Sequence, residues 1–76
     1  MDIKATVCQI VEDIVGYEAK PEDNIVSDLN GDSLDLVQIC MEVEKEFDLN
    51  ISDEDYTKWR TVQDVIDYVE QNYHAR

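Results

Sequence analysis

The sequence has few cysteines and no long apolar runs, and both shortages restrict the class of protein. Cys8 and Cys40 are the only cysteines in 76 residues. They lie in separate apolar segments, which does not resemble a secreted disulfide framework or a metal-ligand spacing. There is no basic leader followed by an apolar run, and no stretch approaches membrane-spanning length. We therefore expect a cytoplasmic protein in a reducing compartment, with no membrane association.

Basic residues are also scarce: six Lys and Arg stand against 19 Asp and Glu, for a net charge of −13. Phosphate binding requires clustered cations, so we do not expect nucleic acid or an anionic membrane as a partner. Residues 28–56 hold ten of the acids and a single base, Lys45. This acidic field favours partners with basic surfaces, although charge of this kind also serves solubility alone.

The spacing of apolar residues predicts helices over residues 2–15, 33–47 and 62–73. Ser52, followed by Asp55 three residues later, is a capping signal that predicts a short helix over residues 53–59. Gly16 is the expected stop of the first helix. Residues 17–31 lack a sustained period and predict a long ordered loop. The residues expected to pin this loop to the core are Tyr17, Ile25, Val26 and Leu29. The fold class is therefore all-α: one domain over residues 1–76, built as a small bundle of three main helices and one short helix.

The helix expected over residues 33–47 carries two apolar stripes. The core stripe consists of Leu36, Cys40, Val43 and Phe47, with Ile39 at its edge. A second stripe, formed by Leu34, Val37 and Met41, lies away from the first and is flanked by polar and charged residues. It is either a protein contact surface or a surface that the long loop covers.

Ser33 opens this helix, and its role has several candidate explanations. The spelling "GDSL" over residues 31–34 matches a family of serine esterases, but a serine nucleophile needs a positioned base. The only histidine is His74, near the C-terminus, and Gln71 stands where that family has an acid. We therefore expect no catalytic residues. As a simple helix cap, either Asp32 or Ser33 would serve.

A calcium loop is the other motif that the same segment suggests. Asp28, Asn30 and Asp32 match its first three ligand positions, but Ser33 replaces the required glycine and Ile39 the bidentate glutamate. We expect no metal site.

The segment "DLNGDSLDLVQICMEVEKEFDLNISDEDYTKWRTVQDVIDYV", residues 28–69, resembles an acyl carrier protein. The family's central pattern "LGxDSL" appears here as "LNGDSL", and the later "EKEFDLNISDED" and "TVQD" also match. The resemblance implies that 4′-phosphopantetheine is attached to Ser33 by a phosphopantetheinyl transferase. Asp32 and Leu34 would help that enzyme recognise the site. The thiol of the attached arm would hold acyl groups as thioesters for fatty-acid, polyketide or related enzymes, so the chain itself is not expected to be an enzyme.

The resemblance also implies a monomer whose partners are synthase, ligase or transferase enzymes with basic docking patches. The implied partner-facing residues are Asp35, Val37, Gln38, Met41 and Glu44. Phe47, Ile51 and Val65 are candidates for lining an acyl cavity.

The sequence also departs from the family pattern. Gln38 and Lys45 stand where acids are common, Asn30 replaces a glycine, Ser52 a proline and Trp59 a smaller aliphatic residue. We therefore hypothesise a specialised carrier. A peptidyl or aminoacyl carrier and an acidic interaction module without the arm remain alternatives.

Overall fold

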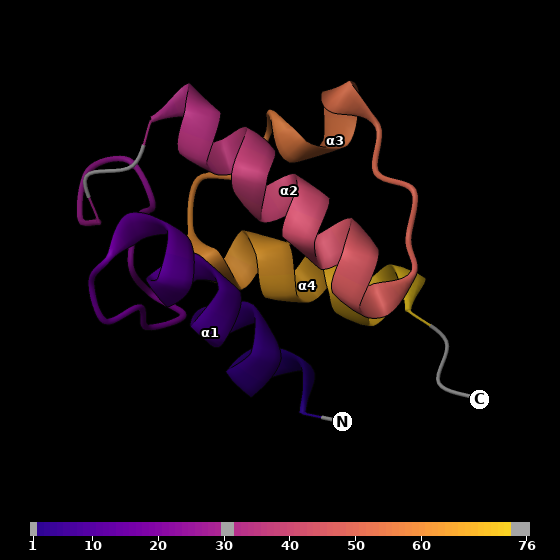
Figure 1. Ribbon diagram of the computed structural model, residues 1–76, viewed down its shortest axis with the longest axis horizontal. Helices are drawn as coiled ribbons and strands as arrows, with labels where there is room; N and C mark the ends of the chain where they lie inside the picture. The colour runs from indigo at the N-terminus through magenta and orange to yellow at the C-terminus, as the bar shows by residue number, and fades with distance from the viewer. Residues whose placement is uncertain (1, 30–31, 74–76) are drawn as a thin grey trace.

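The computed structural model describes residues 2–29 and 32–73, so Asn30, Gly31 and His74 lie outside the described residues. Within these ranges the chain is all-helical, as the sequence predicts (Figure 1). The helices, in chain order, are α1 (Ile3–Val15), α2 (Ser33–Phe47), α3 (Asp53–Tyr56) and α4 (Val62–Asn72). The bounds of α2 agree with the prediction, whereas α3 ends three residues earlier than the range predicted for it.

Local side chains set most helix ends. The Asp2 carboxylate accepts a hydrogen bond from the Ala5 N–H at 3.2 Å and caps α1, which ends at Gly16 with a left-handed φ of 82°. Thr61 and Asp64 form a reciprocal capping box at the start of α4. α3 is short because the chain turns after Tyr56 and buries Trp59, which is only 3% exposed. Burial of this large side chain outweighs continuation of the helical pattern.

The core lies where α1, α2 and α4 meet. α1 packs against both α2 and α4, and α3 contacts α2. In Figure 1, α4 crosses behind α2, and α1 lies at the lower left of the view, below α2. The predicted core stripe of α2 faces the core: Cys40, Val43 and Phe47 are buried, as is Ile39 at its edge, and Leu36 is half-buried and packs against the core.

The loop between α1 and α2 is held against the connection between α3 and α4. Asn24 and Thr61 form an isolated antiparallel bridge, and the Ile25 N–H donates to the Arg60 carbonyl at 2.8 Å. The Asn24 side chain also accepts the Val26 N–H at 3.0 Å, which closes a tight turn.

Two of the four residues expected to pin this loop do so: Ile25 and Leu29 are buried. The prediction was wrong for Tyr17 and Val26, which are 59% and 47% exposed. The turn at Asn24 directs Ile25 inward and leaves its neighbour Val26 in solvent. Ala19 is buried instead, and its N–H donates to the Glu12 carboxylate at 3.2 Å.

Candidate functional site

The start of α2 shows which residue caps the helix. The Asp32 carboxylate accepts the Asp35 N–H at 3.0 Å, and the Asp35 carboxylate accepts the Asp32 N–H at 3.2 Å. This is a reciprocal capping box, with Asp32 as the N-cap and Ser33 as the first helical residue. Of the two capping candidates, Asp32 is therefore the correct one. Ser33 is exposed, and its hydroxyl is not needed to start the helix.

Two other hydroxyl residues at helix starts behave differently. Ser52 caps α3 by accepting the Asp55 N–H at 3.3 Å, and Thr61 caps α4 by accepting the Asp64 N–H at 3.2 Å. Both hydroxyls act as helix caps, whereas the exposed Ser33 is the first residue of a 15-residue helix and does not cap it. N–H groups in a first helical turn have no intrahelical partner, and the positive end of the helix dipole lies there. An anionic group on Ser33 would fit this environment.

The second apolar stripe of α2 is largely in solvent. Leu34 is 69% exposed and Met41 is 60% exposed, while Val37 is half-buried. The described part of the loop therefore does not cover this stripe. Gln38, which borders it, is also exposed. Together these side chains form an accessible, partly apolar surface that begins next to Ser33.

Two acids implied as partner-facing also stabilise the fold. Asp35 belongs to the capping box, and Glu44 accepts the Ile51 N–H at 2.8 Å through one carboxylate oxygen. Both residues are half-buried. Neither role was predicted from the sequence. The acid at the third position after Asp32 was a usable capping signal, but the bond to Ile51 spans seven residues and has no local pattern.

The three candidates for an acyl cavity, Phe47, Ile51 and Val65, are all buried. Phe47 packs edge-on against Tyr73, with ring centroids 5.2 Å apart. Trp59 packs edge-on against Tyr68 at 5.7 Å. Of the three candidates, Phe47 therefore has an aromatic partner in the core.

Neither cysteine is poised for chemistry. Burial raises the pKa of the Cys40 thiol to about 11, and the nearby carboxylates of Glu44 and Asp53 add to this effect. Burial and Glu12 raise the pKa of Cys8 as well. Both thiols are therefore protonated near neutral pH and are poor nucleophiles. In the part of the chain that is described, no group of three or more His, Cys, Asp or Glu residues is placed to hold a metal ion.

The fold and the exposed serine at a helix start agree with comparisons to known proteins. The family model described as "Phosphopantetheine attachment site" matches residues 5–69. This match defines the class as a carrier of 4′-phosphopantetheine. A solved structure from Mycobacterium tuberculosis, described as a "putative acyl carrier protein", is 31% identical and superposes with a TM-score of 0.85. The match covers 91% of this chain and 96% of that chain.

The chain belongs to the acyl carrier protein family. The cofactor of this family is 4′-phosphopantetheine, and its members are carriers rather than catalysts. Among the helices of residues 2–29 and 32–73, none has the length and apolar character needed to cross a membrane.

Proposed function

We propose that Ser33 carries the 4′-phosphopantetheine arm and that the protein holds acyl intermediates for biosynthetic enzymes. The observation that supports this most strongly is the division of roles at the start of α2. Asp32 caps the helix, and the exposed Ser33 side chain has no capping role. When bound, the cofactor supplies a terminal thiol that forms thioesters with acyl groups. The chain contributes the attachment point and the docking surface and is not itself a catalyst.

The charges around Ser33 favour an arm that projects into solvent. The first turn of α2 can stabilise the phosphodiester through its N–H groups and dipole. The Asp32 and Asp35 carboxylates lie in the same turn and would keep the attached phosphate on the side of the turn that faces solvent. An arm that is held only at its root is suited to reaching an active site on another protein.

The surface beside Ser33 suits recognition by other enzymes. Asp32 and Leu34 flank the attachment point and would contact the phosphopantetheinyl transferase. The residues proposed to meet acyl synthases, ligases or transferases are Asp35, Val37, Gln38, Met41 and Glu44. Basic patches on these enzymes would steer the encounter, and the exposed Leu34 and Met41 would supply apolar contact. The net charge of −13 favours a monomer, and the free Cys8 and Cys40 suit a reducing cytoplasm.

Acyl cargo is favoured over peptidyl or aminoacyl cargo by the likeness to the mycobacterial structure and by the acidic second helix. The polar Gln38 and the basic Lys45 on that helix favour a specialised carrier, because rim charges select partners.

Intact mass spectrometry tests the attachment. The protein is incubated with coenzyme A, Mg²⁺ and a broad-specificity phosphopantetheinyl transferase, beside Ser33→Ala and Ser52→Ala variants. Wild type and Ser52→Ala should each gain one phosphopantetheine unit, and Ser33→Ala should gain none. If none of the proteins gains mass with several transferases, an acidic interaction module without the arm becomes the better explanation.

A further inference from the structure

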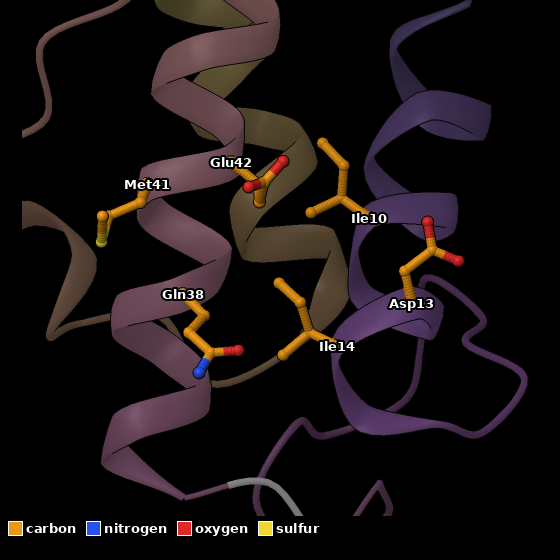
Figure 2. Close-up of a pocket in the computed structure, with 6 residues that line it drawn as sticks. All are labelled: Ile10, Asp13, Ile14, Gln38, Met41 and Glu42. Atoms are coloured by element: carbon orange, nitrogen blue, oxygen red, sulfur yellow. The ribbon is translucent and has the colours of Figure 1, made fainter.

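A groove between α1 and α2 lies beside the proposed partner surface. One hollow in this groove has a volume of about 360 Å³ (Figure 2). The residues that line it are Ile10, Asp13, Ile14, Gln38, Met41 and Glu42. Figure 2 shows Gln38 and Glu42 of α2 directed toward Ile14 and Ile10 of α1, with α4 passing behind the gap. Met41 lies on the outer side of α2, where the groove meets the exposed stripe.

The groove is longer than this one hollow. A second hollow of about 380 Å³ shares Ile10, Asp13 and Glu42 with the first and extends to Ala5 and Glu46. From Ala5 to Ile14, α1 rises about 13 Å, which is the length of two to three helical turns. Ile10 and Ile14 are one turn apart on α1 and are half-buried, so they give the groove an apolar strip at helical spacing.

The charges that line the groove have one sign. Asp13, Glu42 and Glu46 line the two hollows, and no Lys or Arg is among the described residues that do so. All three acids are exposed. The Asp13 carboxylate accepts a bond only from the exposed Gln9 side chain, at 2.9 Å, so it remains accessible to a cation. An occupant must therefore combine apolar anchors with positive charge.

We compared three kinds of occupant for this groove, and two of them match its lining poorly. A second copy of the chain would bring another net charge of −13 against these acids. A tethered hydrocarbon chain would bury apolar groups against Asp13 and Glu42 and remove water from carboxylates that it cannot pair. A basic amphipathic helix meets both requirements, because its apolar face fits between two helices and its cations can pair with the rim.

We propose that the α1–α2 groove binds a basic amphipathic helix of a partner protein. Apolar side chains of that helix, spaced by one turn, pack on Ile10 and Ile14, and its Lys or Arg residues pair with Asp13 and Glu42. Gln38 and Met41 belong to both this groove and the proposed docking surface of α2, so one partner can contact both. The inference extends the partner side of the proposed function, but the groove does not depend on Ser33 or the arm.

The test uses ¹⁵N-labelled full-length protein and a synthetic helical peptide of about 18 residues. The peptide has leucine at i, i+3, i+4 and i+7 on one face and lysine and alanine elsewhere. A control peptide has the same composition with the leucines dispersed around the helix. The first peptide should shift the backbone amides of Ile10, Asp13, Ile14 and Glu42 and should bind more tightly than the control peptide.

A matched pair of double variants separates groove binding from general attraction. Asp13→Asn with Glu42→Gln removes two negative charges at the groove, and Asp67→Asn with Glu70→Gln removes two from the exposed face of α4. Asp13 and Asp67 are closely matched, since each accepts a bond from a glutamine four residues earlier. The groove variant should weaken peptide binding about fivefold, whereas the α4 variant should change it less than about twofold.

Several results would overturn the proposal: no peptide binding, equal binding of both peptides, equal weakening by both double variants, or amide shifts outside α1 and α2. Displacement of the peptide by an octanoyl group loaded on the arm, with shifts at Ile10 and Ile14, would assign the groove to cargo instead. Because the peptide experiment works on protein without the arm, its failure would leave the attachment to Ser33 untouched. A protein that cannot be loaded would likewise leave the peptide result valid.

Discussion

The hydroxyl of Tyr68 on α4 donates a hydrogen bond to the carboxylate of Asp55 on α3, at 3.1 Å. α3 is a single turn with no buried residue of its own, so it depends on contacts with its neighbours. The ring of Tyr68 also packs edge-on against Trp59, three residues after the end of α3. The Tyr68–Asp55 bond therefore fastens the shortest helix of the bundle to the core.

Replacing Tyr68 by Phe should loosen α3 while keeping the ring in place. We expect the free energy of unfolding to fall by about 1 kcal/mol, the usual effect of losing one partly buried hydrogen bond. Amide hydrogen exchange should accelerate more at Tyr56 and Thr57 than at Val11 in α1. Urea denaturation and exchange measured by NMR check both effects. Uniform acceleration across the whole chain would show that the bond does not act locally on α3.

The capping box at the start of α2 gives a prediction that separates fold from recognition. Asp32→Ala removes the cap and should lower the free energy of unfolding by about 1 kcal/mol. Asp32→Asn keeps an equivalent hydrogen-bond acceptor and should lower the free energy of unfolding by only a few tenths of a kcal/mol. Both variants remove the charge next to Ser33. If the phosphopantetheinyl transferase recognises that charge, both variants should gain phosphopantetheine more slowly than wild type. Urea denaturation and the rate of mass gain provide the two readouts, and equal destabilisation by Asn and Ala would contradict the capping role.

Sequence alone predicted the elements whose causes are local. The helical period and the capping residues of α2 lie within a few positions of each other, so its bounds agree with the structure. The degree of burial along the core stripe of α2, complete at Ile39 and partial at Leu36, depends on packing between helices, which no local pattern records. The early end of α3 has a similar origin, because the burial of Trp59 is a tertiary effect.

For the candidate site, the sequence placed Ser33 at the start of a helix that carries a second apolar stripe, and the structure agrees; it left open whether the loop covers this stripe, and Leu34 and Met41 are exposed. It left open whether Asp32 or Ser33 was the cap, since both residue types serve equally well there. The pairing of Glu44 with Ile51 links a helix to the following loop across seven residues, and helical periodicity does not describe such a contact. The α1–α2 groove was missed because it exists only once the two helices are packed together.

Asp64 should make the stability of the fold depend on pH. Burial disfavours its ionised form, but N–H bonds from Thr61 and Arg60 prevail and hold the pKa of the carboxyl below its usual value. A carboxyl whose pKa is lower in the folded state contributes stability above the unfolded pKa of about 3.9. That contribution is lost as the pH falls from about 4 through the folded pKa.

We therefore expect Asp64→Asn to be about 1 kcal/mol less stable than wild type at pH 7, because a neutral acceptor forms weaker bonds than a carboxylate. The difference should shrink below about pH 4. Urea denaturation at each pH measures it, with Asp67→Asn as an exposed control. A difference between Asp64→Asn and wild type that stays constant down to pH 2.5, if the protein remains folded there, would contradict this assignment.

The two thiols should react with a disulfide reagent more slowly than ordinary surface cysteines. Since the pKa of Cys40 is about 11 and its side chain is buried, we expect it to react with a disulfide reagent at pH 8 at least about 100-fold more slowly than a free cysteine. Cys8, which is only half-buried, should react first. Absorbance kinetics on protein without the arm, with Cys8→Ser as the control, measure both rates. Rapid reaction of Cys40 in the Cys8→Ser variant would mean that the core opens readily around α2.

The central claim is that the arm is joined to Ser33, and tandem mass spectrometry of a proteolytic digest tests it most directly. The chain has three serines, Ser27, Ser33 and Ser52, all exposed, so a mass gain on intact protein alone does not identify the site. After loading from coenzyme A, the fragment ions should place the phosphopantetheine on Ser33 and leave Ser27 and Ser52 unmodified. Modification of either of those serines, with Ser33 unmodified, would contradict the account.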